Sequence, residues 1–218
     1  MSTKSPPTIP AELADRITRA DYVCGSDETG YGSWAGPLLV VSVRVPRHWQ
    51  GPPGLTDSKK LTPAKREALA ERLIGDPQVM IRRVWYLAPE IDRVGVYRAC
   101  IEAHQIVHEG TTGLHIADGN LDLGPHIVSL PKADLLIPAV SAASVIAKVA
   151  RDREMTTLGA AHPGYGFPEH KGYGTPAHQE ALTKLGPCKI HRRSYAPVQQ
   201  ALQAAEARAQ ADMMTEDW

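Results

Sequence analysis

Residues 22–45 read YVCGSDETGYGSWAGPLLVVSVRV, and this segment predicts two strands joined by a turn. The first strand is expected at Tyr22–Asp27, and the longer second strand, Leu38–Val45, is rich in β-branched residues. Several glycines lie between the two and indicate a tight turn. Two acids, Asp27 and Glu28, stand where the first strand ends. Acids in that place are poorly suited to a core and well suited to the rim of a cleft.

Outside this segment, strand signals come first and helix signals collect towards the C-terminus. Three more strands are expected, at Val79–Leu87, Leu114–Ala117 and Ile127–Leu130. The expected helices cover residues 63–74, 89–108, 138–158, 176–185 and 197–213. This order predicts a mixed α/β sheet with a helical C-terminal part. We expect a flexible N-terminal lead over residues 1–18, one domain over 19–200 that is helical from about residue 155, and a terminal helix with an acidic tail over 201–218.

Composition excludes several classes of protein. The chain has 218 residues, 24 Lys and Arg against 24 Asp and Glu, and therefore no formal net charge, unlike a protein that coats nucleic acid non-specifically. Its three cysteines, Cys24, Cys100 and Cys188, are far apart, which argues against a disulfide framework or a zinc site. No apolar stretch reaches the roughly 20 residues of a membrane span, and Met1–Pro10 lacks the core of a secretory signal. We expect a cytoplasmic protein that is a monomer and does not contact membranes.

Two further acids stand at exits from predicted elements. Asp118 follows the strand at Leu114–Ala117, and Asp134 precedes a long apolar helix. Taken singly, Asp118 is explained by a turn and Asp134 by a helix cap, and both interpretations stay open. Clustered carboxylates repel one another, and Mg²⁺ or Mn²⁺ is the usual means of holding them together. Asp27 and Glu28 point to opposite faces of a regular strand, so both reach one metal pair only if the chain bends there.

A resemblance to a known family connects these observations. Six segments resemble, in order and spacing, the motifs of bacterial ribonuclease HII, the type 2 ribonuclease H family. They are GSDETGYGSWAGP (25–37), DSKKL (57–61), DGN (118–120), SAASVIAKVARD (141–152), YGF with HKGYGT (165–175) and HRRSY (191–195). The resemblance extends from about residue 22 to 198. It implies a ribonuclease H-like mixed five-stranded sheet flanked by helices.

The resemblance also implies a reaction. Asp27, Glu28, Asp118 and Asp134 would be the catalytic acids and the ligands of two Mg²⁺ or Mn²⁺ ions, although Asp134 follows Lys-Ala where the family has Lys-Gly. Two ions about 4 Å apart would activate water and stabilise the leaving oxygen, which gives a 3′-hydroxyl and a 5′-phosphate. The substrates would be RNA–DNA hybrids and DNA duplexes that contain ribonucleotides. A hybrid-binding module with weak or lost turnover is the alternative, and another nuclease of the superfamily is a third. Some relatives carry a sliding-clamp peptide, but the tail contains no convincing version.

Substrate contacts are also implied by the resemblance. The turn would read the ribose 2′-hydroxyl through backbone groups and an arginine, but here it is Gly30-Tyr31-Gly32. Because tyrosine cannot replace a guanidinium, we expect weaker binding or a relaxed preference for the RNA–DNA junction. Tyr173 would pack on a sugar, with flanking glycines that leave space for a ligand. The other expected contacts are Lys59, Lys60, Ser144, Lys148, Lys171 and Arg192, the last within a basic patch over residues 165–195.

Overall fold

The computed structural model describes residues 7–215, which form two compact units. The first unit takes in the residues up to Thr29 together with 39–85 and 100–150. The second takes in residues 30–38, 86–99 and those from Arg151 onward. Each unit has its own hydrophobic core, and each is described by itself below.

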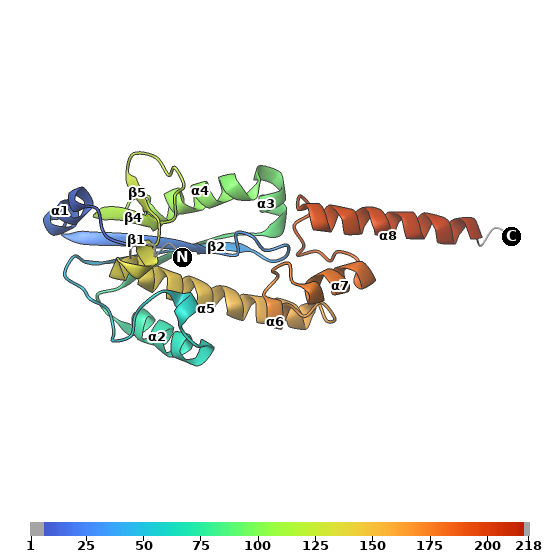
Figure 1. The fold of residues 1–218 in the computed structure, drawn as a ribbon, viewed down its shortest axis with the longest axis horizontal. Coiled ribbons are helices and arrows are strands. Elements are labelled where there is room, and N and C mark those ends of the chain that lie inside the picture. The colour runs from blue at the N-terminus through green and yellow to red at the C-terminus, as the bar shows by residue number, and fades with distance from the viewer. Residues whose placement is uncertain (1–6, 216–218) are drawn as a thin grey trace, which may run out of the picture. The chain divides into compact units, whose positions relative to one another are not determined.

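A mixed sheet forms the centre of the first unit (Figure 1). Its five strands lie in the order β3-β2-β1-β4-β5. They are β1 (Tyr22–Thr29), β2 (Leu38–Pro46), β3 (Met80–Tyr86), β4 (Leu114–Asp118) and β5 (Ile127–Leu130). β1 pairs with β2 in antiparallel fashion and with β4 in parallel, and β4 and β5 are also parallel. The expected mixed five-stranded sheet is therefore confirmed.

Helices account for most of the remaining residues. They are α1 (Ala11–Arg19), η1 (Ser58–Lys60), α2 (Pro63–Gly75), α3 (Ala88–Val94), α4 (Val96–His108), η2 (Ala133–Leu135), α5 (Pro138–Ala161), α6 (Phe167–His170), α7 (Pro176–Leu185) and α8 (Ala196–Thr215). α2 and α7 begin as predicted, because Thr62 and Thr175 cap their first turns and a proline follows each. Over residues 7–215, no helix has the length and apolar character needed to cross a bilayer.

Two expectations about local structure are wrong. The single helix expected over residues 89–108 is two helices, because Gly95 has a φ of 82° and ends α3. The lead expected over residues 1–18 is helical from Ala11 onward, because Leu13 is buried in the core of the first unit and Ile17 packs against that core. Residues 1–6 of that lead and residues 216–218 of the acidic tail lie outside the described part of the chain.

The sheet of the first unit has helices on both faces. α2 and α5 share the main core with β1 and β2, and α4 lies on the opposite face (Figure 1). β1 contacts both layers through alternate residues. A Cβ at Gly25 would lie 2.3 Å from the backbone nitrogen of Val140 in α5, whereas the Ser26 hydroxyl lies 2.9 Å from His104 in α4. Residues 25 and 27 therefore face α5, and residues 26 and 28 face α4.

The close approach of β1 to α5 predicts a large effect at Gly25. In Gly25→Ala the added methyl group would overlap the backbone of α5, which cannot rotate away, so we expect unfolding free energy to fall by about 1–3 kcal/mol or more. Gly75→Ala is the matched control. Nothing lies within 4 Å of its added methyl group at the end of α2, and we expect a gain of about 0.4–1 kcal/mol. Urea unfolding measures both; equal, small effects would contradict the packing described here.

Candidate active site

Three aspartates gather at one edge of the sheet in the first unit. Ser26 of β1 pairs with Ala117 of the parallel strand β4, so the next residues, Asp27 and Asp118, lie side by side where the pairing of these two strands ends. Asp134 joins them from η2. Each residue offers one carboxylate oxygen, and the three oxygens lie within 4.8 Å of one another. The structure thus brings together three of the four acids that the sequence predicts.

Backbone contacts fix the positions of Asp118 and Asp134. One Asp118 oxygen accepts a hydrogen bond of 2.7 Å from the backbone N–H of Ala133, which ties the end of β4 to η2. Lys132 adopts the left-handed conformation, with a φ of 66°, immediately before η2. The Ser141 hydroxyl, on the first turn of α5, donates to the carbonyl of Asp134 at 2.6 Å. Asp134 is consequently held through its backbone carbonyl, and one of its carboxylate oxygens lies near those of Asp27 and Asp118.

The three aspartates hold their negative charge at a cost in free energy. Burial first, and then the charge of Glu28, raise the pKa of Asp27 well above its usual range. Burial also raises the pKa of Asp118, although hydrogen bonds from Ala133 and Gly119 oppose the change. Burial and the charge of Asp118 raise the pKa of Asp134 to about 6. A set of closely spaced oxygen donors that resist ionisation fits a hard divalent cation such as Mg²⁺ or Mn²⁺.

Glu28 lies on the other face of β1. β1 keeps its pairing with β2 as far as Thr29, so the bend that would turn Asp27 and Glu28 the same way does not occur between residues 22 and 29. One Glu28 carboxylate oxygen lies 3.3 Å from Nε2 of His104. Glu28, Cys100 and His104 offer ligand atoms within 4.8 Å of one another and form a second group. The charge of Glu28 still acts across the strand, since it raises the pKa of Asp27 and of Asp118.

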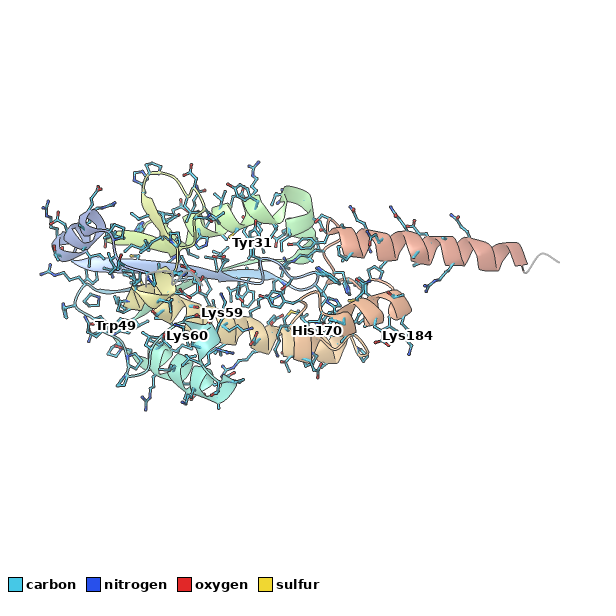
Figure 2. All side chains as sticks on the ribbon, in the orientation of Figure 1. Tyr31, Trp49, Lys59, Lys60, His170 and Lys184 are labelled. Carbon is cyan, nitrogen blue, oxygen red and sulfur yellow. The ribbon has the colours of Figure 1, made fainter. Side chains whose placement is uncertain are left out.

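The two predicted lysines lie on η1, next to α2 (Figure 2). Asp57 caps η1 by accepting from the Lys59 N–H at 2.8 Å, and Arg66 of α2 donates to the carbonyls of Ser58 and Leu61, both at 2.9 Å. Lys59 is exposed, as is Lys60. Although partial burial opposes its charge, the nearby aspartates, Asp27 foremost, raise the pKa of Lys59. Lys59 is therefore a cation within the electrostatic reach of the acids.

Ser144 and Lys148 lie one turn apart on α5. The Ser144 hydroxyl is buried and lies 3.0 Å from the Ser58 hydroxyl, and its hydrogen bond with the side chain of Asp27 lowers the pKa of that residue. Ser144 thereby joins α5 to η1 and to Asp27 beneath the surface, rather than presenting a free hydroxyl to a substrate. Lys148 is half-buried.

The second unit contains the turn Gly30-Tyr31-Gly32, and Arg192 holds this turn through hydrogen bonds to backbone carbonyls. Its guanidinium donates to the carbonyls of Gly30 at 2.6 Å, Tyr31 at 2.9 Å and Gly36 at 3.1 Å. Tyr195 adds a hydrogen bond of 2.7 Å to the Tyr31 carbonyl. Arg192 is fully buried, so it does not belong to the exposed basic patch expected over residues 165–195. The expected direct contact with substrate is corrected accordingly: Arg192 acts on the conformation of the turn.

Arg151 organises the neighbouring loops of the second unit in the same way. Its buried guanidinium donates to the carbonyls of Pro37 and Lys171 at 2.8 and 2.9 Å and to the Ser33 hydroxyl at 2.9 Å. The guanidinium carbon lies 5.5 Å from the ring centre of Tyr173, which is 36% exposed. The Lys171 ammonium group donates to the Asp152 carbonyl at 3.4 Å and to the Thr156 hydroxyl at 3.2 Å.

The glycines beside Tyr173 have a different role from the expected one. A Cβ at Gly172 would lie 2.2 Å from the Ala35 carbonyl oxygen, and one at Gly174 would lie 2.2 Å from the Trp34 ring. These glycines permit close packing against residues 34 and 35, so they do not leave space for a ligand. By contrast, a Cβ added at Gly32 would have no neighbouring atom of the described residues within 4 Å, apart from those of adjacent residues in the chain.

Sequence reasoning missed four residues of these sites. Cys100 was considered as an isolated cysteine and His104 not at all, although their spacing of four residues predicts one shared face. Arg151 directly follows the apolar run 138–150, and a charge in such a place signals a buried hydrogen-bonding role. Ser33 lies within the turn motif, but no local pattern indicates that it accepts from Arg151.

Comparisons with known proteins give consistent results. The sequence model of the Ribonuclease HII family matches residues 24–198. A curated relative, Ribonuclease HII of Thermus thermophilus, is 44% identical over 186 residues, which cover 82% of this chain and 88% of the relative. The crystal structure of ribonuclease H2 from Pyrococcus horikoshii matches with a TM-score of 0.68 and 24% identity, covering 86% of this chain and 99% of that one. Bst-RNase HIII in complex with Mn²⁺ matches with a TM-score of 0.67 and 20% identity, covering 94% of this chain and 77% of that one. The two structural matches bear on the fold alone.

The raised pKa of Asp134 predicts a pH-dependent gain in stability when its charge is removed. In metal-free protein, Asp134→Asn should be more stable than the wild type at pH 7, because the folded wild type holds an unfavourable charge. As pH falls through about 6 the folded wild type takes up a proton that the unfolded chain binds only near its ordinary value of 3.8, so the difference should shrink. Buried histidines with lowered pKa values, such as His108, also make stability depend on pH. Their contribution is the same in the wild type and the variant, so it cancels in the difference between the two unfolding free energies.

Urea unfolding with a chelator present, at several pH values between 7 and 4, measures this difference. A constant difference over that range, or a variant that is less stable at pH 7, would contradict the assigned repulsion.

Proposed function

Because the chain belongs to the ribonuclease HII family of metal-dependent nucleases, we propose that it hydrolyses the RNA strand of RNA–DNA hybrids and nicks DNA at embedded ribonucleotides. The products would be a 3′-hydroxyl and a 5′-phosphate. The observation that carries this proposal is the group of three carboxylate oxygens within 4.8 Å of one another at the ends of two adjacent strands. Such a group fits the hard cations that catalyse phosphodiester hydrolysis by a two-metal mechanism.

In this proposal Asp27, Asp118 and Asp134 hold the cations, and Glu28 contributes from the opposite face of β1. Bound Mg²⁺ or Mn²⁺ would supply an activated water and stabilise charge on the leaving oxygen. The protein holds the acids before any cation arrives, through the bond from Ala133 to Asp118 and the bond from Ser141 to the Asp134 carbonyl. Such preorganisation removes the free-energy cost of assembling the ligands during the reaction.

Lys59 and Lys60 bind phosphates of the nucleic acid backbone in this proposal. Both are exposed on η1, which is held in place by the Asp57 cap and by Arg66. Lysine acts on phosphate as a point charge, and contacts of this kind position a duplex without reading its sequence. Lys148 and Lys171, which are half-buried, remain predicted phosphate contacts because each carries a positive charge.

The turn Gly30-Tyr31-Gly32 recognises the ribose 2′-hydroxyl. Arg192 and Tyr195 donate hydrogen bonds to the carbonyl groups of Gly30 and Tyr31. These bonds fix the conformation of the turn and leave its other backbone groups for the substrate. The open space beside Gly32 admits the close approach of a sugar. The exposed ring of Tyr173 packs against the neighbouring sugar.

A cleavage assay tests the proposed activity. The full chain with Mg²⁺ or Mn²⁺ should cut both a full RNA–DNA hybrid and a DNA duplex that contains one ribonucleotide. Asp118→Asn should lower the rate at least about a hundredfold, because it removes a ligand from a centre worth several kcal/mol. Asp122→Asn is the control, since exposed Asp122 uses a carboxyl oxygen to accept from the Gly124 N–H and asparagine keeps an equivalent oxygen. If the protein binds both duplexes and cuts neither, the proposed nuclease activity is wrong and the hybrid-binding alternative is supported.

The missing arginine of the turn gives a second prediction. Tyr31→Arg adds charged donors beside the expected position of the 2′-hydroxyl, and one charge-assisted hydrogen bond is worth about 1.5–3 kcal/mol. Binding of the duplex with a single ribonucleotide should therefore tighten about tenfold or more, while binding of an all-DNA duplex changes much less. Equilibrium binding measured in Ca²⁺ compares the two duplexes. An equal gain on both would assign the effect to added positive charge alone.

A further inference from the structure

The second group of donors in the first unit, Glu28 with Cys100 and His104, shares only Glu28 with the proposed aspartate centre. Cys100 and His104 lie one turn apart on α4, so they share the face that meets β1. Both are fully buried, whereas the side chain of Glu28 is 27% exposed to solvent. A cation would therefore reach this group from the side of Glu28.

The donor atoms suit a different metal from the one that the aspartates suit. Thiolate, imidazole and carboxylate are the three ligand types of protein zinc sites, whereas Mg²⁺ prefers oxygen alone. Tetrahedral ligands about 2.0–2.3 Å from one ion lie about 3.3–3.8 Å apart. Because the three donor atoms already lie within 4.8 Å of one another, binding requires that they approach one another by about 1 Å, through side-chain rotation.

His104 is oriented as a metal-binding histidine is. Its Nε2 faces Glu28 at 3.3 Å, and its Nδ1 lies 2.9 Å from the Ser26 hydroxyl. Metal-bound histidines commonly engage a hydrogen-bonding partner through the second ring nitrogen. A hydroxyl both donates and accepts, and Ser26 has His108 at 2.9 Å as its other partner, so Ser26 can accept from Nδ1 of His104 when Nε2 binds a metal.

The surroundings of Cys100 favour a cation over a free thiolate. Cys100 is fully buried, its sulfur lies within 4.8 Å of a Glu28 carboxylate oxygen, and Asp27 is the neighbour of Glu28 in the chain. A divalent cation replaces the thiol proton, which passes to solvent, and offsets the two neighbouring negative charges.

We propose that Glu28, Cys100 and His104 form a binding site for Zn²⁺, and that Zn²⁺ bound there inhibits the nuclease by withdrawing Glu28 from the acids that serve Mg²⁺ or Mn²⁺. The site itself stands on the geometry of the first unit. The inhibition rests on the function proposed above.

Co²⁺ is the spectroscopic probe for the site. The metal-free full chain, without nucleic acid, should develop thiolate-to-Co²⁺ charge-transfer absorption in the near ultraviolet, and Zn²⁺ should abolish it by displacement. Cys100→Ser should lack this absorption. Cys188→Ser, the matched control, should keep it because Cys188 belongs to the second unit. Asp118→Asn should also keep it, since Asp118 offers no ligand to this group.

Cleavage assays in Mg²⁺ test the inhibition. Added Zn²⁺ should inhibit the wild type and Cys188→Ser equally. The rate of each variant in Zn²⁺ is compared with its own rate without Zn²⁺. The inhibition constant of Zn²⁺ for Cys100→Ser should rise at least about 10–100-fold, because loss of even a residue that supports a metal ligand lowers metal affinity by that factor. If Cys100→Ser fails to fold, Cys100→Ala supplies the same comparison, because a buried cysteine behaves as a small hydrophobic residue.

The outcomes separate the two proposals. No charge-transfer absorption in the wild type, or the same absorption in Cys100→Ser, overturns the site. Unchanged Zn²⁺ inhibition in the Cys100 variant overturns the inhibitory role. Charge-transfer absorption in a protein that cuts neither duplex in Mg²⁺ leaves the Zn²⁺ site standing and overturns the proposed nuclease.

Discussion

Mutual repulsion among three carboxylates sets the requirements that the first unit must meet. Asp27, Asp118 and Asp134 bring oxygens within 4.8 Å of one another, and burial adds to the free energy of their charged forms. The core shared by the sheet, α2 and α5 offsets this cost, and hydrogen bonds from Ala133 and Ser141 prevent the acids from moving apart. The charge that destabilises the metal-free chain is the charge that attracts a divalent cation, so stability and function depend on one group.

The alternation of side chains along β1 divides the adjacent acids between two environments. Asp27 faces α5 and the oxygen-rich group, whereas Glu28 faces α4 with its thiol and imidazole. One strand thus presents a ligand set for hard cations on one face and a set for borderline cations on the other. In the second unit, buried guanidinium groups perform the corresponding structural task, because Arg151 and Arg192 fix the turn and its neighbouring loops through backbone carbonyls.

Patterns that act locally in the chain predicted much of this structure. β-branched runs predicted the strands, and Thr62 and Thr175, each before a proline, predicted two helix starts. The family resemblance of the surrounding motifs predicted that Asp118 and Asp134 gather with Asp27, since their positions alone left a turn and a helix cap as explanations. Tertiary contacts decided the rest. Burial of Leu13 in the core of the first unit stabilises α1. Gly95 ends α3 and so divides a segment whose apolar pattern predicts one continuous helix. The burial of Arg192 depends on carbonyls more than 150 residues earlier in the chain, which no local pattern encodes.

Proton release on metal binding tests the central claim, that buried carboxylates held together against their repulsion form the cation site. Calorimetric titration of Mn²⁺ into the metal-free full chain near pH 6, the value to which the pKa of Asp134 is raised, gives the number of protons released when two buffers of different ionisation enthalpy are compared. We predict binding heats that differ between the buffers, because Mn²⁺ displaces protons from these carboxyl groups. Identical heats in the two buffers, with Mn²⁺ bound, would contradict the account.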